Sequence, residues 1–233
     1  MQLFYAPKVE GKQLVLPESD SKHAIRVLRK TVGDTIHVVD GNGGLYTCKI
    51  SDANAKTAAL DVISYESNYQ PLPYYLHIAI APTKNMDRIE WFVEKAVEIG
   101  VHELSFIKCA HSERRHFKID RIQKVAISAM KQSVKAFLPK MNDFQNVSDL
   151  IKSAKADAKC IAYVDHGNEK TLSSCIKPNG SHLILIGPEG DFNQLEVALA
   201  EEHKFEKVNL GPSRLRTETA GVAATHTVYL AHL

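Results

Sequence analysis

The chain of 233 residues carries 29 basic and 27 acidic side chains, 44% hydrophobic residues and 24% charged residues. This composition is that of an ordinary soluble globular protein with enough residues for one large domain or two small ones. No apolar run approaches the roughly 20 residues that a membrane span needs. The N-terminal sequence MQLFYAPKVEGKQ lacks the basic start and long apolar core of a secretory signal, so we expect a cytoplasmic protein without a membrane partner.

The spacing of the cysteines and histidines argues against a metal site. No C-x-x-C pair occurs, which disfavours zinc and a disulfide framework and favours reduced thiols at Cys48, Cys109, Cys160 and Cys175. His111, Glu113 and His116 look like metal ligands, but zinc needs four well-spaced ligands, or three and a water, and no partner pair follows. We therefore expect no metal.

The net charge of +2 is unevenly distributed along the chain. Residues 1–83 carry 8 basic and 8 acidic side chains, residues 84–140 carry 12 and 7, and residues 141–233 carry 9 and 12. A basic surface confined to the middle of a near-neutral chain fits an RNA partner that is held at one surface. A solvated helix face gives the same charge count, and this alternative stays open.

The first 70 residues predict a small β-barrel. Strand patterns over residues 35–40 and 45–50 flank the sequence Gly41-Asn42-Gly43-Gly44, which is a strong hairpin signal. A third strand is expected over residues 58–63, and one short helix from Asp20 to Arg29. Several short strands that pair with one another are typical of a barrel.

A linker and a second domain follow. Pro71, Pro73 and the polar run 67–70 indicate the linker, so we expect one domain over residues 1–70 and another over 74–233. From Tyr75 onward strands alternate with helices, which favours a mostly parallel sheet with helices on its faces. The expected strands are Leu76–Ala81, Leu104–Ile107, Cys160–Val164, His182–Ile186 and Lys207–Leu210.

Two helices of the second half are amphipathic. The helix over residues 87–99 ends at Gly100 and has an apolar stripe of Ile89, Phe92, Val93, Ala96 and Val97, which is core. A second helix is expected from about Lys118 to Phe137. It follows Arg114 and Arg115, and its basic side chains are Arg121, Lys124, Lys131 and Lys135. Several cations within reach of one backbone suit phosphate neutralisation, so this face is the predicted RNA contact.

Two polar glycine loops near the C-terminus predict a binding site. The apolar strand 182–186 runs directly into Gly187-Pro188-Glu189-Gly190, and Asn193 with Glu196 then forms a capping box that opens a helix. The strand 207–210 leads into a second loop, over residues 211–220. Open α/β sheets bind ligands at such strand ends. Neither loop matches a P-loop or the G-x-G-x-x-G dinucleotide pattern.

The sequence GPEGDF followed by LGPSRLRTETA resembles the C-terminal signature of the bacterial small-subunit (16S) ribosomal RNA methyltransferase E family. The resemblance covers the whole chain and includes His23 with Arg26-Val27-Leu28-Arg29 and Gly33-Asp34, Asp40-Gly41-Asn42-Gly43, Lys84-Asn85-Met86-Asp87-Arg88 with residues 94–101, Ser112-Glu113-Arg114-Arg115, and Lys131-Gln132-Ser133. Two departures are Asp191, where the family more often has a third glycine, and Ser213, where the usual arginine is displaced to Arg214.

The resemblance implies a fold and an activity. The fold would be a SPOUT-type α/β domain with a mostly parallel, trefoil-knotted sheet, preceded by an RNA-binding PUA-like β-barrel. Pattern rules alone would not predict a knot, because knotted chains are rare. The activity would be methylation of N3 of a uridine with S-adenosylmethionine, in RNA of an assembled or nearly assembled small ribosomal subunit. Two alternatives are ribose 2′-O-methylation by a related SPOUT enzyme and a non-catalytic PUA-type RNA-binding assembly factor.

The resemblance also implies site residues. Cofactor binding is expected at Leu185, Ile186, Gly187, Pro188, Glu189, Gly190, Leu210, Gly211, Leu215, Thr217 and Ala220, with backbone groups of Leu210 and Leu215 reading the adenine. RNA binding is expected at Arg26, Arg29, Lys30, Lys84, Arg88, Arg114, Arg115, Lys131, Gln132, Ser133 and Lys135.

Arg216 and Glu218 are the expected catalytic residues. Arg216 is a permanently charged donor for a uracil carbonyl, and Glu218 is a carboxylate that could accept a proton or orient the cofactor. The alternative makes Thr217 a helix cap and Glu218 a first-turn carboxylate that complements the helix dipole. A homodimer is also expected, and the small-residue run 220–224 could pack against another helix or against its own sheet.

Overall fold

The structure is a computed structural model that describes residues 1–9, 11–114, 116–164 and 169–233. The chain folds into two units. Met1–Pro71 with Ile127–Leu138 form the first unit, and Leu72–Ala126 with Pro139–Leu233 form the second. Within the described ranges no helix is long and apolar enough to cross a membrane.

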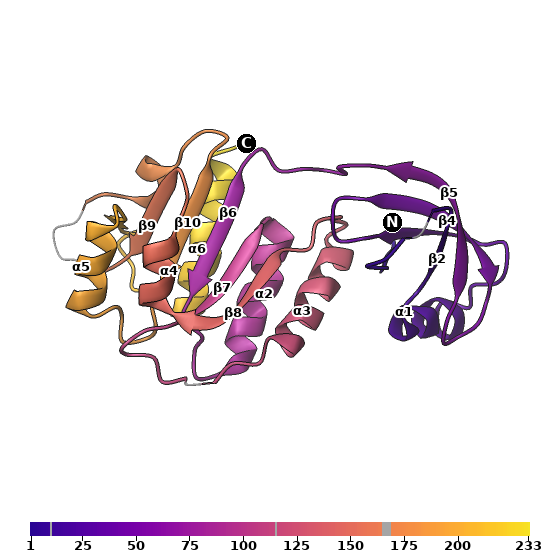
Figure 1. Cartoon of the computed structure of the whole chain (residues 1–233), viewed down its shortest axis with the longest axis horizontal. Helices are drawn as coiled ribbons and strands as arrows, with labels where there is room; N and C mark the ends of the chain where they lie inside the picture. The colour runs from indigo at the N-terminus through magenta and orange to yellow at the C-terminus, as the bar shows by residue number, and fades with distance from the viewer. Residues whose placement is uncertain (10, 115, 165–168) are drawn as a thin grey trace. The chain divides into compact units, whose positions relative to one another are not determined.

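The first unit is a five-stranded mixed sheet in the order β1-β3-β4-β5-β2 (Figure 1). Its strands are β1 (Leu3–Tyr5), β2 (Gln13–Val15), β3 (Thr35–Val39), β4 (Leu45–Asp52) and β5 (Ala59–Glu66). The ladder between β4 and β5 has two register shifts, which bend paired strands. The sheet is a half-barrel around a core that includes Phe4, Leu16, Val38, Ile50 and Leu60, and the three predicted strands are confirmed.

The expected helix over residues 20–29 differs in its bounds and its form. It starts as α1 (Glu18–Lys22) directly after Pro17 and continues as the π-helix η1 (His23–Val27). Leu28 N donates to His23 O at 3.0 Å, a bond across five residues that defines the wider turn.

The hairpin between β3 and β4 follows the glycine signal. The carboxylate of Asp40 accepts hydrogen bonds from Asn42 N at 2.7 Å, Gly44 N at 2.9 Å and the Tyr46 hydroxyl at 3.1 Å. Gly43 has φ +94°, and a Cβ there would lie 2.4 Å from the Phe137 ring. Phe137 therefore packs directly on the hairpin backbone, and only glycine fits at position 43.

The second unit is an α/β domain with a six-stranded, wholly parallel sheet in the order β11-β9-β10-β6-β7-β8. Its strands are β6 (Tyr75–Ile80), β7 (Glu103–Lys108), β8 (Lys140–Asn146), β9 (Ala158–Ala162), β10 (Ser181–Ile186) and β11 (Glu206–Val208). The five expected strands are confirmed with small shifts of their ends. β8 has no apolar run because it lies at the sheet edge, and the sequence pattern missed it.

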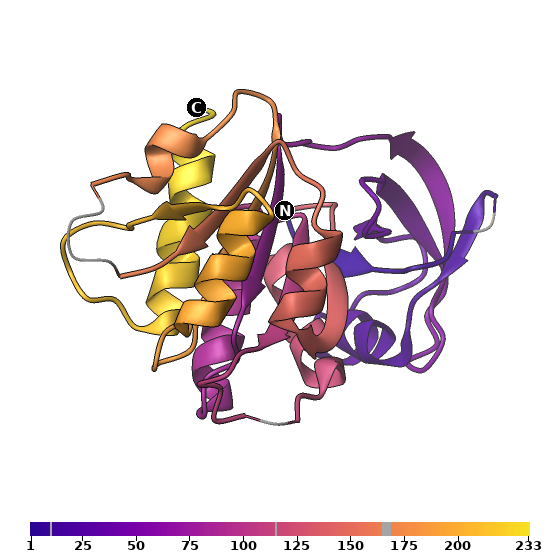
Figure 2. The same ribbon diagram turned by 60° about the vertical axis from the view of Figure 1, so that its left-hand side comes forward.

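Helices cover both faces of this sheet (Figures 1 and 2). α4 (Val147–Ser153) and α5 (Gln194–Glu202) lie together on one face, where their apolar side chains pack with Ala79, Leu183 and Leu185. α2 (Met86–Ile99) and α6 (Thr217–Leu230) pack on each other on the other face.

The chain also contains α3 (Ile119–Gln132) and the 3₁₀ helix η2 (Leu172–Cys175). The N-cap of α2 is Asn85, whose side chain accepts a hydrogen bond from Asp87 N. Gly100 is the C-cap and ends the helix, as predicted. α5 opens with the predicted capping box of Asn193 and Glu196.

The prediction that the α3 helix extends to Phe137 is wrong. Val134 has φ +58°, which ends the helical path two residues after Gln132, and Lys135 therefore lies beyond the helix. The apolar pattern continues past the end of the helix because Ala136 and Phe137 pack in the first unit.

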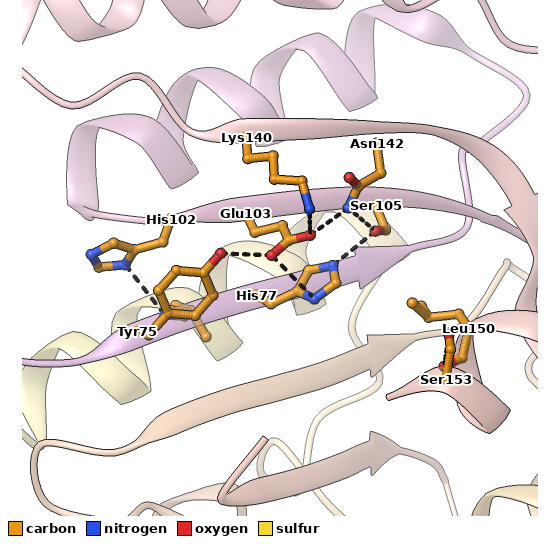
Figure 3. Close-up of polar contacts among 10 residues, drawn as sticks. Tyr75, His77, His102, Glu103, Ser105, Lys140, Asn142, Leu150 and Ser153 are labelled. Carbon is orange, nitrogen blue, oxygen red and sulfur yellow. Dashed lines mark hydrogen bonds and ion pairs between the residues drawn. The ribbon is translucent and has the colours of Figure 1, made fainter. Parts of the chain in front are cut away.

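A polar network joins the beginnings of three strands (Figure 3). The carboxylate of Glu103 accepts from the Tyr75 hydroxyl at 2.6 Å, from Asn142 Nδ2 at 2.6 Å and from Lys140 Nζ at 2.9 Å. His77 Nε2 lies 2.8 Å from Ser105 Oγ. Burial alone would raise the pKa of Glu103, but the hydrogen bonds from Tyr75, Asn142 and Lys140 outweigh it and hold the pKa at about 2.

We expect Glu103 to make folding stability dependent on pH in the acid range. The folded carboxyl keeps its charge down to a pKa of about 2, whereas the unfolded one takes up its proton near the ordinary value of 4.5. The contribution is therefore complete above pH 4.5 and is lost as the pH falls toward 2. In urea unfolding, the stability difference between wild type and Glu103→Gln should shrink between pH 5 and pH 2.

The exposed Glu202 of α5 supplies the matched control. The difference between wild type and Glu202→Gln should stay nearly constant over the same pH range. A Glu103→Gln difference that is equally constant would contradict the role assigned to the network.

Candidate functional site

The carboxyl ends of all six parallel strands of the second unit lie at one edge of the sheet. The loops 81–85, 187–193 and 209–216 leave this edge after β6, β10 and β11. β10 and β6 are neighbours, while β9 and β11 extend the sheet on the other side of β10. Chain connections leave β6 and β10 in opposite directions, and such a reversal point is where open α/β sheets bind ligands.

The GPEGDF loop is held by the segment that follows β7. His111 Nδ1 lies 2.9 Å from Gly190 O and 3.0 Å from Asp191 O, so this nitrogen donates to the loop backbone. Ala110 N donates to Glu196 Oε1 at 2.7 Å. A Cβ at Gly190 would lie 3.0 Å from the Cβ of His111. Glycine at position 190 therefore permits the close approach of the two segments.

The backbone conformation and hydrogen bonds of Asp191 account for its departure from the family pattern. Its φ is +61°, in the left-handed region that glycine adopts freely and that aspartate tolerates better than most residues. Its carboxylate accepts from Phe192 N at 2.8 Å and from Val164 N at 3.3 Å. Burial raises the pKa of Asp191. The side chain is thus part of the turn itself, and the loop keeps its path without the third glycine.

The second glycine loop leads directly into α6. Gly211 has φ +115°, and a Cβ there would meet no atom within 4 Å, so the loop backbone is open at this point. Arg216 is the N-cap residue of α6, and its side chain makes no capping hydrogen bond. The idea that Thr217 caps the helix is wrong, because Thr217 is the first helical residue and is buried. The acidic residue of the first turn is Glu218, as expected.

An open pocket of about 590 Å³ lies beside this helix start. It is formed by the end of the second glycine loop, the first turn of α6 and one side of α2. Its lining residues are Asp87, Arg88, Trp91, Arg214, Leu215, Arg216, Glu218 and Thr219. Three arginines and two carboxylates in one pocket can recognise a polar, planar group.

Glu218 is the most constrained of these residues. Its side chain is only 8% exposed, and Oε1 lies 3.7 Å from Arg88 Nε. Its other oxygen, Oε2, is buried and has no hydrogen-bond partner among the described residues. A buried carboxylate oxygen without a donor costs stability, and a catalytic role is one of the reasons for which such groups occur.

The predicted cofactor residues occupy both glycine loops and their flanking elements. Leu185 and Ile186 are buried at the end of β10, Pro188 is buried, and Glu189 and Gly190 are exposed at the loop tip. Leu210, Leu215 and Ala220 are half-buried, and Gly211 is exposed. Leu215 also lines the pocket.

Three of the predicted RNA-binding residues, Arg114, Lys84 and Arg88, have other contacts in the second unit. The guanidinium of Arg114 donates to Thr83 O at 3.0 Å and to Lys84 O at 2.5 Å, so it holds the loop after β6. Lys84 is 83% exposed and lies 3.3 Å from Glu113. Arg115 lies outside the described residues. Arg88 lines the pocket beside Glu218 and is therefore joined to the predicted catalytic pair.

The other predicted RNA-binding residues belong to the first unit. Lys131 forms an ion pair with the buried Asp20 at 2.7 Å, and the hydroxyl of Ser133 donates to Ala129 O. Burial lowers the pKa of Lys135. Arg26, Arg29 and Gln132 are exposed, and Lys30 is half-buried. Among the cations predicted as one helix face, Lys131 pairs with Asp20 and Arg121 pairs with Glu90, whereas Lys124 is exposed.

Trp91, Asp87 and Thr219 were not predicted as site residues. Trp91 is 42% exposed, whereas the next residue, Phe92, is fully buried. An aromatic residue on the helix side opposite an apolar stripe is the signal that could have identified it. Within the described parts of the chain, no group of three or more histidine, cysteine or acidic side chains could hold a metal ion.

Two family profiles match the chain. The profile of an RNA methyltransferase domain matches residues 70–229, and that of an RNA methyltransferase PUA domain matches residues 16–63. Together they extend over both units.

Individual relatives agree with the profiles. The chain is 27% identical over 219 residues to ribosomal RNA small subunit methyltransferase E of Bacillus subtilis, which covers 88% of this chain and 85% of the relative. The structure resembles a probable rRNA-methyltransferase from Porphyromonas gingivalis with a TM-score of 0.91, 43% identity and 99% coverage of both chains. It also resembles ribosomal RNA small subunit methyltransferase E from Neisseria gonorrhoeae, bound to S-adenosyl methionine, with a TM-score of 0.87, 25% identity and coverage of 97% and 95%.

Proposed function

This chain belongs to the RNA methyltransferase family, in its small-subunit methyltransferase E group, and from that premise we propose that it methylates N3 of one uridine in small-subunit ribosomal RNA. It is an S-adenosylmethionine-dependent RNA methyltransferase with an α/β domain and an RNA-binding PUA domain. The uridine N3 target is our proposal. The observation that carries it is the buried, unpartnered Glu218 Oε2 in a pocket shared with Arg216.

The two glycine loops fit a cofactor that is bound mainly through backbone groups. Gly190 and Gly211 leave exposed main chain at the loop tips, and Leu210 and Leu215 are half-buried beside the second loop. We assign cofactor binding to the backbone of residues 185–190 and 210–211, with Leu215, Thr217 and Ala220 lining the same site. When bound, S-adenosylmethionine supplies an electrophilic methyl group on a sulfonium that is also the leaving group.

The chain's own residues must prepare the nucleobase. Uracil N3 carries a proton and is a poor nucleophile until that proton leaves, so transfer needs a proton acceptor and a group that stabilises the uracil anion. Glu218 Oε2 is a buried acceptor without a donor, which suits it to take the N3 proton. Arg216 lines the same pocket and can donate to a uracil carbonyl as negative charge develops there.

Arg88 has a supporting part in this assignment. Its guanidinium nitrogen Nε lies 3.7 Å from Glu218 Oε1 and pairs with the carboxylate at that oxygen. One oxygen of Glu218 is thus paired with Arg88, and we assign the other, Oε2, to the base. Alignment of the methyl carbon with N3 is the remaining contribution of the site.

Calorimetry tests the enzyme assignment. Titration of S-adenosylmethionine into the protein, alone and with small-subunit RNA, should show saturable binding at tens of micromolar or tighter. Absence of binding in both titrations would leave a non-catalytic RNA-binding assembly factor as the better description.

We further propose that the substrate is RNA in an assembled or nearly assembled subunit, that the enzyme is cytoplasmic and that it acts as a homodimer. We assign the PUA-like RNA-binding domain to residues 1–70, the methyltransferase domain to 74–233, and a trefoil knot to the latter by analogy with SPOUT enzymes. Gly221 and Ala224 of the small-residue run are buried, so its half-buried members Ala220, Val222 and Ala223 remain for a partner. Light scattering at micromolar concentration should give a mass near twice 25.9 kDa.

The exposed lysines of the middle segment predict a salt-dependent RNA contact. Lys118 and Lys124 are exposed near and on α3. Replacing both with glutamine should weaken RNA binding and reduce the slope of log affinity against log salt by about one to two, because fewer counterions are released.

A matched double variant at Lys152 and Lys155, two exposed lysines on and after α4, should keep the wild-type slope. Cofactor affinity should be the same in all three proteins. An unaltered slope in the first variant would mean that this lysine pair is only solvated.

A further inference from the structure

The chain's single tryptophan, Trp91, lies in the pocket beside the catalytic pair. It projects from α2, one helical turn after Arg88 and Asp87, which line the same pocket. Its 42% exposure is high for the largest apolar side chain, whereas Ile89 and Phe92 on the same helix are fully buried. Packing within the chain therefore does not account for the position of Trp91 in the pocket.

Exposed aromatic side chains that line cationic pockets are stacking platforms for nucleobases. Base–aromatic stacking contributes about 1–3 kcal/mol per base, and every base has a π face that can stack. Arginines on the pocket wall add donors for carbonyl oxygens at the edge of such a base. The pocket's volume of about 590 Å³ is within the range of small-molecule sites and is ample for one base.

Glu218 and the arginines of the pocket can recognise the hydrogen-bonding edge of a base that stacks on Trp91. Glu218 Oε2 has no donor among the described residues, and Arg214 and Arg216 are exposed donors of the same pocket. The edge of uracil presents a ring N–H between two carbonyl oxygens, which matches this arrangement. The edge of cytosine presents an unprotonated ring nitrogen toward the carboxylate and an amino group toward the arginines. An acceptor then faces an acceptor, and a donor faces a donor.

We infer that this pocket is a uracil-reading subsite in which Trp91 stacks on the base and Glu218 distinguishes uracil from cytosine through its ring N–H. The inference rests on the proposed uridine reaction and assigns to Trp91 a role in binding the base. Trp91 acts on either pyrimidine, because stacking does not depend on the hydrogen-bonding edge. Glu218 determines the ratio of the affinities for uracil and cytosine.

The single tryptophan provides the measurement. Titration of wild-type protein with uridine monophosphate should change its fluorescence, excited at the red edge of the tryptophan band, in a saturable way. Cytidine monophosphate should need about tenfold or more higher concentration, as expected for one mismatched hydrogen bond in a buried site. In Glu218→Gln the preference should fall toward one, because a carboxamide can turn to donate or accept.

Variants of Trp91 are measured by calorimetry, since they lack the fluorophore. Trp91→Ala should weaken both nucleotides by about fivefold to a hundredfold, and Trp91→Phe, which keeps a ring, should weaken them less. Leu195→Ala, at an exposed residue of α5 outside the pocket, should bind both nucleotides as wild type does. Thermal unfolding of each variant separates loss of binding from loss of folding.

Methylation of undermethylated small subunits is measured beside the titrations, so that the two proposals fail separately. Equal affinity for the two nucleotides, or no response to uridine monophosphate, in a protein that methylates subunits would overturn the uracil-reading role and leave the proposed reaction intact. A clear uracil preference in a protein that does not methylate subunits would support the subsite and contradict the reaction.

Discussion

Arg216→Ala should lower the single-turnover rate of methylation by about a hundredfold or more, with cofactor affinity largely kept. The expected size is that of losing one preorganised donor aimed at developing charge. Arg216 lines the pocket with Glu218, and in the proposed reaction its guanidinium donates to a uracil carbonyl as the ring becomes anionic. Undermethylated small subunits, mixed with excess enzyme and cofactor, provide the assay.

The position of Arg216 in the fold makes this variant easy to interpret. Arg216 is the N-cap of α6, but its side chain makes no capping hydrogen bond, so alanine removes none. Folding should therefore be nearly unchanged. Arg216→Lys should fall between wild type and alanine, because it keeps the charge and loses the planar fork of donors. A near-normal rate for Arg216→Ala would remove this residue from the chemistry.

Gly221→Ala should destabilise the second unit by about 1–3 kcal/mol, the usual cost of overpacking a core. Glycine in a helix is normally worse than alanine by about 1 kcal/mol, so an ordinary site would show the opposite sign. Here a new Cβ would lie 2.5 and 2.7 Å from the Phe92 ring and 3.1 Å from Ile80 Cδ1. α6 would have to move away from α2 and β6, and the pocket between the ends of α2 and α6 would move with it.

Thermal unfolding measures this effect, at about 2–4 °C per kcal/mol for a protein of this size. His226→Ala, at an exposed residue of the same helix, is the control and should leave the midpoint nearly unchanged. Combining Gly221→Ala with Phe92→Leu should recover part of the loss, because the smaller side chain gives room to the new methyl group. A midpoint for Gly221→Ala at or above the wild-type value would show that the helices are not in close contact at this glycine.

The strand alternation and the glycine loops were predictable from sequence because both are local patterns. The buried strand over residues 181–186, the capping box at Asn193 and the stop at Gly100 each follow from a few neighbouring residues. β8 was missed because an edge strand needs no apolar run, and its residues 140–146 are mostly polar.

Long-range contacts account for what the sequence could not indicate. Lys131 reads as a free cation on a basic helix, but Asp20, which lies 111 positions away in sequence, pairs with it. Arg114 reads as a phosphate contact, and the fold places the loop after β6 against its guanidinium. Trp91 lines a pocket with Glu218 only because the fold brings the start of α6 beside α2.

The central claim is that this chain methylates the N3 nitrogen of a uridine in small-subunit ribosomal RNA. The most direct test incubates purified subunits that lack the modification with enzyme and S-adenosylmethionine, digests the RNA to nucleosides and identifies the product by mass spectrometry. The account predicts one new 3-methyluridine per subunit, with the methyl group on the base fragment. A methyl group on the ribose fragment, or on a base other than uracil, would contradict it.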